Sequence, residues 1–125
     1  MFDNLFYINL AKLFFAIASI DQTVKPEEVA FLKINLESHL KSSEMISSKD
    51  VNLIFSEFNS LIDRNKNAND CFEEFKEYYF ENNQLFSQTI KSIIWKTADG
   101  IAAAYAEKNK SEVILLAKLK ELFLG

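Results

Sequence analysis

The chain of 125 residues has the length of one domain, and a composition that is 49% hydrophobic and 26% charged is typical of a folded globular protein rather than a disordered one. A net charge of −4 argues against a nucleic-acid-binding surface. A single Cys and a single His exclude a disulfide scaffold and a metal site built from several Cys and His ligands. Two Gly and one Pro are too few turn-formers for a sandwich, a barrel or repeated βα units, so the sequence predicts one all-α domain over residues 1–125.

Hydrophobic spacing predicts about six helices in this bundle. The first is apolar on nearly all sides, but its run Leu5–Ile20 is shorter than the roughly 20 residues that span a bilayer. No positively charged segment precedes it, as a signal peptide would require, so we expect a cytoplasmic protein without a transmembrane segment. The first predicted helix covers about Asp3–Ser19, and the second begins at Pro26. The third begins after Ser48 as its N-cap, and the fourth has Asp70 as its N-cap with Glu73 in a capping box. The fifth covers about Gln84–Glu107 and the sixth about Ser111–Phe123.

The two ends of the chain form a degenerate repeat. Residues 15–22 align with residues 103–110, and Glu28-Val29 then aligns with Glu112-Val113 after a turn that is shorter in the second copy. Each copy has an apolar helix, a polar turn that begins at Asp or Asn, and a Glu near the start of another apolar helix. The sequence therefore predicts related helix-turn-helix units at the two ends, whose flanking helices should superpose.

This arrangement resembles the TerB-like family of all-helical domains associated with tellurite resistance. The family's mark is a helix that ends in Ala-x-x-Asp-Gly, followed by x-Val/Ile-x-x-Glu-Glu at the opening of the next helix, often twice in the chain. Residues 18–28, ASIDQTVKPEE, match this mark except that Gln22 replaces the Gly. In the second copy Asn109 replaces the Asp. The resemblance covers the whole chain in layout and about forty positions in specific residues.

The resemblance implies a compact helical bundle, a stress-associated bacterial setting and acidic turns that handle divalent cations, and it implies no reaction. The positions that carry over are Asp21 and Glu28, with Glu112 as a partial third. Because at most three carboxylates converge there, we expect a weakly bound cation such as calcium. Loss of the Gly and of the second Asp weakens this site.

A second candidate cation site lies in the middle of the chain, where oxygen-bearing side chains occupy positions 1, 3, 5, 7 and 12 of an EF-hand-like loop. Position 6 is Ala68 rather than the Gly that the sharp turn needs, and only two carboxylates are present. A polar helix connection explains the same residues. The candidate ligands are Asp63, Asn65, Asn67, Asn69 and Glu74.

Catalysis has little support in the sequence. Cys71 follows the predicted helix N-cap, but its sole possible imidazole partner, His39, is on a different predicted helix. We therefore expect a non-enzymatic TerB-like module that acts through a protein partner or a weakly bound cation. The alternatives are a calcium-binding regulatory domain centred on Asp63–Glu74 and an enzyme that uses Cys71 or paired carboxylates.

Overall fold

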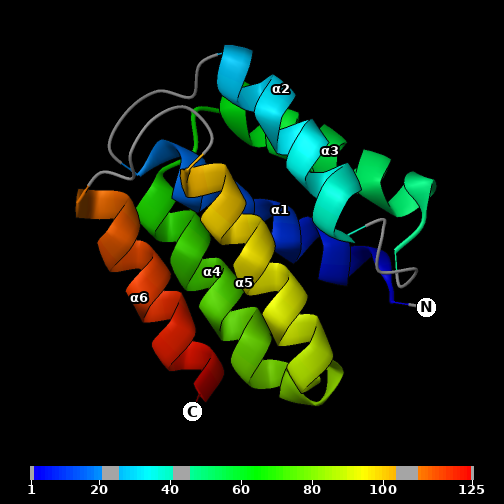
Figure 1. Ribbon diagram of the computed structural model, residues 1–125, viewed down its shortest axis with the longest axis vertical. Coiled ribbons are helices and arrows are strands. Elements are labelled where there is room, and N and C mark those ends of the chain that lie inside the picture. The colour runs from blue at the N-terminus through cyan, green and yellow to red at the C-terminus, as the bar shows by residue number, and fades with distance from the viewer. Residues whose placement is uncertain (1, 21–25, 41–45, 104–109, 125) are drawn as a thin grey trace.

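A computed structural model describes residues 2–20, 26–40, 46–103 and 110–124, without the side chains of residues 26–28 and 39–40. These residues form six α-helices and no strand, which confirms the predicted all-α fold (Figure 1). No helix in these ranges combines the length and the apolar character needed to cross a membrane. The elements are α1 (Asn4–Ser19), α2 (Pro26–Asn35), the π-helical turn η1 (Leu36–Leu40), α3 (Ser48–Asp63), α4 (Ala68–Glu81), the 3₁₀ turn η3 (Asn83–Leu85), α5 (Gln88–Ala102) and α6 (Lys110–Leu124).

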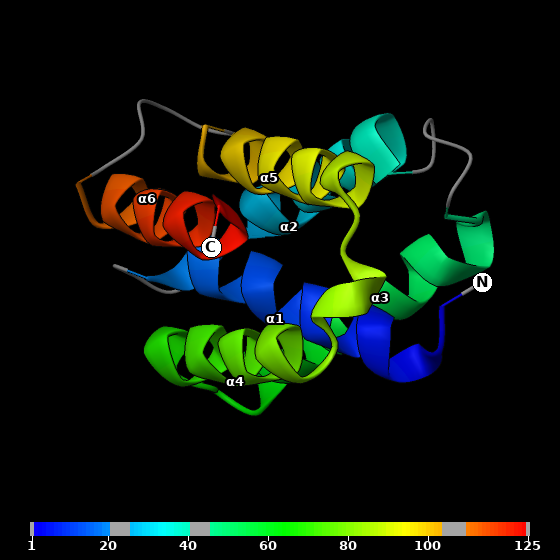
Figure 2. The same ribbon diagram turned by 90° about the horizontal axis from the view of Figure 1, so that it is seen from below.

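Helix α1 lies at the centre of the bundle, with α3 and α4 packed on one side and α5 and α6 on the other (Figure 2). Two polar side chains of α1 are satisfied by the helix's own backbone, which lowers the cost of their burial. The Asn9 amide donates to the carbonyl oxygen of Leu5 at 2.9 Å, and the Ser19 hydroxyl donates to that of Phe15 at 2.8 Å. The predicted burial of this helix on nearly all sides is confirmed.

An aromatic cluster joins α1, α4 and α6 around Phe86. The Phe86 ring lies 5.4 Å from that of Phe6, 5.0 Å from that of Tyr79 and 6.3 Å from that of Phe123, centroid to centroid. Aromatic ring pairs at this separation attract each other, and this attraction adds to the stabilisation that comes from burying their apolar area. Phe86 was expected within the fifth helix; instead it follows η3 and precedes the Ser87 N-cap, so α5 begins at Gln88 rather than near Gln84.

Two other helix starts also differ from the prediction. The N-cap of α3 is Ser47, whose hydroxyl accepts from the backbone N–H of Asp50 at 3.2 Å, while the Asp50 carboxylate accepts from the Ser47 N–H at 3.1 Å. The N-cap of α4 is Asn67 rather than Asp70, because the Asn67 side-chain oxygen accepts from the Asp70 N–H at 3.1 Å. An earlier Asn cap thus satisfies the free N–H groups and extends α4 into the predicted loop.

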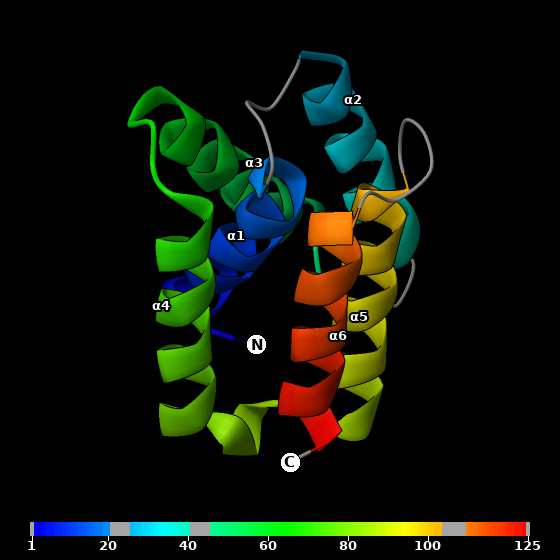
Figure 3. The same cartoon turned by 90° about the vertical axis from the view of Figure 1, so that its left-hand side faces the viewer.

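The two halves of the sequence repeat pack differently in the described residues. Helices α5 and α6 lie side by side, whereas α1 and α2 make little direct contact (Figure 3). Most of the two turns, residues 21–25 and 104–109, lies outside the described residues. Superposition of the two helix pairs therefore stays a prediction, and their unequal packing gives it no support.

Candidate functional site

The first predicted cation position lies mostly outside the described residues. Asp21 and the side chain of Glu28 are not described. Glu112 is 8% exposed and lies in the first turn of α6, where the positive end of the helix dipole favours a carboxylate. Cation binding by these three residues stays a prediction.

The second predicted site, the segment Asp63–Glu74, does not form a twelve-residue loop. Asp63 is the last residue of α3, and both Asn69 and Glu74 lie within α4, which leaves a short turn between the helices. Its geometry is that of a helix C-terminal cap followed by an N-cap. Asn65 has a positive φ of 52°, and the N–H of Lys66 donates to the carbonyl oxygen of Leu61 at 3.1 Å.

Helix capping explains two of the Asn residues in this segment. Asn is among the residues that most readily adopt the left-handed conformation found at Asn65, and that conformation lets the last carbonyl groups of α3 be satisfied. The side-chain oxygen of Asn67 caps α4. These two predicted ligands thus have structural roles that the sequence pattern alone did not separate from cation binding.

Glu74, the predicted closing ligand, lies between two lysines. Its Oε1 is 2.9 Å from Nζ of Lys12 on α1, and its Oε2 is 3.5 Å from Nζ of Lys66. The hydrogen bond from Lys12, followed by the charges of both lysines, holds the pKa of Glu74 below its usual value despite partial burial. Both carboxylate oxygens are therefore engaged by cationic side chains. Throughout the residues that the structure describes, no group of three or more His, Cys, Asp or Glu side chains is placed to hold a metal ion.

Cys71 is fully buried in the bundle core. Burial, and then the charge of Glu74, raise the pKa of its thiol. Since the thiolate is the reactive form, this environment disfavours a nucleophilic role. The side chain of His39 is not described, so the predicted absence of a Cys–His pair is not tested.

A surface groove lies between α4 and α6, and we call it the α4–α6 groove. The two helices run in the same direction; α4 packs mainly on α1, and α6 packs on α5 and α1 (Figure 3). The ring of Phe123 joins them near their C-terminal ends, 5.4 Å from that of Tyr79 and 6.4 Å from that of Phe75. The hollow has a volume of about 420 Å³, and its lining consists of Phe72, Glu73, Lys76, Phe80, Lys118, Glu121 and Leu122.

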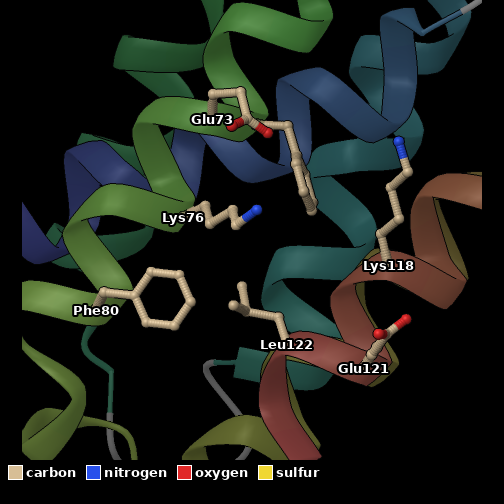
Figure 4. A pocket seen from close by; sticks show the side chains of 7 residues that line it. Glu73, Lys76, Phe80, Lys118, Glu121 and Leu122 are labelled. Atoms are coloured by element: carbon tan, nitrogen blue, oxygen red, sulfur yellow. The ribbon is translucent and has the colours of Figure 1, made fainter. Parts of the chain in front are cut away.

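Apolar side chains from the two helices face each other across this groove. Phe80 of α4 and Leu122 of α6 point toward one another, and the Lys76 side chain extends between the helices (Figure 4). Phe80 is 58% exposed, while Phe72 is buried. The groove therefore has an apolar interior with charged side chains around it.

The charged groups of the α4–α6 groove are not neutralised by each other. Lys76, Lys118, Glu73 and Glu121 form no ion pair within 4.0 Å among the described residues. The sequence alone did not predict this surface, because Phe72 and Phe80 have the helical spacing that core positions of α4 also have. Local periodicity does not determine which of the two is covered.

Comparison of the chain with known protein families, with curated proteins and with solved structures gives no match.

Proposed function

We propose that this protein is a non-enzymatic, TerB-like helical module of the bacterial cytoplasm, with a stress-associated role, that acts by binding a protein partner in the α4–α6 groove. The family, the cellular setting and the role rest on the sequence resemblance. The binding mode rests on the groove itself.

One observation carries the proposal: Phe80 is 58% exposed beside an open hollow of about 420 Å³. An exposed apolar patch with polar groups at its edge is typical of a protein-interaction surface. A partner's apolar side chain inserted between Phe80 and Leu122 would remove both from water. Each side chain buried in this way contributes up to about 1.5–3 kcal/mol.

The described residues favour partner binding over the other functions considered. The Glu74 carboxylate is already paired with two lysines, which disfavours the calcium-binding loop. The Cys71 thiol is buried with a raised pKa, which disfavours an enzyme that uses it. Cation binding by Asp21, Glu28 and Glu112 remains a separate proposal, which a metal titration followed by NMR would test.

Photo-crosslinking in cells tests the proposal. A photoreactive amino acid replaces Phe80 in one variant and Ile34 in a matched control, because Ile34 on α2 is equally exposed, at 60%, and lies away from the groove. We expect a specific crosslinked protein from position 80 and not from position 34. The captured protein must then bind purified wild-type protein and lose affinity for Leu122→Ser. Equal crosslinking from both positions would contradict the proposal.

A further inference from the structure

Another pocket lies between α5 and α6, where α5 begins and α6 ends, and we call it the α5–α6 pocket. Its volume is about 280 Å³, close to the lower limit of about 300 Å³ for pockets that bind small molecules. Among the residues that the structure describes, no Asp or Glu lines it. Two uncharged polar side chains contribute to the lining, and its charged and apolar members are Lys91, Lys96, Lys120, Trp95, Phe123 and Leu124.

The three lysines of this pocket are not paired with carboxylates. No ion pair within 4.0 Å involves Lys91, Lys96 or Lys120 in the described part of the chain. The ammonium group of Lys120 lies 5.8 Å from the centre of the Trp95 ring, and this cation–π contact keeps it at the wall of the pocket. The protein has a net charge of −4, so the α5–α6 pocket is a local concentration of positive charge that favours an anion.

The surroundings of the lysines indicate how much negative charge the pocket accommodates. Lys91 already donates a hydrogen bond to the carbonyl oxygen of Phe123 at the negative end of α6, which offsets part of its charge. Lys96 and Lys120 are exposed and have no such acceptor among the described residues. Two uncompensated ammonium groups match a phosphate monoester, which carries about two negative charges at neutral pH, better than a carboxylate with one.

The start of α5 and the type of cation also favour phosphate. Gln88, the first residue of α5, lines the pocket, so the positive end of that helix dipole adds to the attraction for an anion. Lysines act as point charges that suit the tetrahedral phosphate group, whereas planar, bidentate recognition of a carboxylate favours Arg, and no Arg lines the pocket among the described residues.

Apolar surface adjoins these cations. Leu124 is 79% exposed, and its burial against an apolar group would be favourable. The Trp95 ring is also part of the lining. Its indole Nε1 is buried and has no hydrogen-bond partner among the described residues, so an acceptor oxygen beside it would satisfy this donor. The matching ligand therefore carries an apolar body next to its phosphate group.

We infer that the α5–α6 pocket binds an organic phosphate monoester, whose phosphate group lies among the three lysines and whose apolar body packs on Trp95 and Leu124. The inference concerns a different pocket from the α4–α6 groove and does not depend on the proposed function. A phosphate monoester of this kind occurs in soluble organic phosphates and in the headgroup of phosphatidic acid, so the test includes a probe for each source.

Phenyl phosphate, which has both the phosphate and an apolar body, is the soluble probe. Binding is measured from the fluorescence of Trp95, the single Trp of the chain, and is located by amide shifts of the ¹⁵N-labelled protein. Phenol lacks the phosphate, and inorganic phosphate lacks the apolar body. We expect phenyl phosphate to bind at least about tenfold more tightly than either, with shifts at the start of α5 and the end of α6. Its binding should weaken as the salt concentration rises.

Substitution of the lysines tests their role. The double variant Lys96→Gln/Lys120→Gln should raise the dissociation constant of phenyl phosphate at least about tenfold. Lys110→Gln, which alters an exposed lysine at the other end of α6, is the matched control and should change it by less than about twofold. Vesicles that contain phosphatidic acid are the second probe. Vesicle binding that the double variant abolishes would support the inference and assign the phosphate to a lipid headgroup, whereas binding of phenyl phosphate alone would support a soluble ligand.

Three results would overturn the inference. Phenol that binds as tightly as phenyl phosphate would leave an apolar pocket without preference for an anion, and inorganic phosphate that does so would show an adventitious ion only. Absence of fluorescence and amide changes with phenyl phosphate at about 10 mM, together with no vesicle binding, would exclude the ligand class. Equal effects of Lys110→Gln and the double variant would assign any binding to general charge rather than to this pocket.

Discussion

The ammonium group of Lys91 on α5 donates a hydrogen bond to the carbonyl oxygen of Phe123 on α6, at 3.0 Å. Helix α6 has no basic residue in its own last turn, so Lys91 places a positive charge at the negative end of that helix from a neighbouring one. The same ammonium group lies 5.6 Å from the centre of the Tyr79 ring on α4. Lys91 therefore ties together the ends of the helices that form the α4–α6 groove.

Replacement of Lys91 by Met should loosen the end of α6. It removes a partly buried, charge-assisted hydrogen bond, and we expect a loss of about 1 kcal/mol in the free energy of unfolding. Amide exchange in the last turn of α6 should accelerate more than exchange elsewhere. Lys96→Met, on the same helix but exposed, serves as the control. Equal effects of the two substitutions would show that the Lys91 contact contributes nothing.

The packing of the aromatic cluster predicts that Phe86→Ala and Phe80→Ala differ greatly in their effect on the free energy of unfolding. Phe86→Ala removes the ring that contacts three helices and leaves a cavity, so we expect a loss of about 3–5 kcal/mol in urea unfolding. Phe80→Ala, on the exposed side of α4, should change stability by less than about 0.5 kcal/mol. A large loss for Phe80→Ala would mean that its ring supports the fold rather than a binding surface.

Substitutions in the turn between α3 and α4 can distinguish helix capping from cation binding. Asn67→Ala removes the N-cap hydrogen bond of α4 and should cost about 1 kcal/mol without added metal, whereas Asn69→Ala, on an exposed position, should be close to neutral. Thermal unfolding with and without millimolar calcium measures both. Stabilisation by calcium that both substitutions abolish would favour the EF-hand-like interpretation instead.

Glu74 predicts a pH-dependent contribution to stability. Since its pKa is lowered in the folded protein, the unfolded chain takes up the proton first as the pH falls, and the contribution is present at neutral pH and lost on acidification. Glu74→Gln should be less stable than wild type by under about 1 kcal/mol at pH 7, and the difference should shrink as the pH is lowered to about 3. Glu73→Gln is the matched control. A difference that is the same at both pH values would rule out this ion pair as its cause.

The sequence predicted helices well because local periodicity reports which side of a helix is apolar. The burial of α1 and the start of α2 at Pro26 follow from such local signals. The wrong N-caps of α3 and α4 depended on a choice between neighbouring cap residues. Asn67 and Asp70 are both good N-caps, and the one that lies at the end of the tight turn after Asn65 is used.

The candidate site was not predictable in the same way. The spacing of Asp63, Asn65 and Asn67 fits both a cation loop and a pair of helix caps, and only the backbone conformation distinguishes them. The α4–α6 groove depends on how residues about forty positions apart, such as Phe80 and Leu122, are placed on facing helices. The residues of each wall have ordinary helical spacing, so the sequence of either helix alone does not predict the groove. The relative positions of α4 and α6 are needed as well.

The measurement that tests the proposed function most directly is the dissociation constant of the protein captured from position 80. It should be determined by calorimetry for wild type, Phe80→Ser and Ile34→Ser, which alter two equally exposed apolar side chains on different faces. We predict that Phe80→Ser raises the constant at least about tenfold, because a buried aromatic anchor is lost, and that Ile34→Ser leaves it within about twofold. Equal constants for the two variants would contradict binding in the α4–α6 groove.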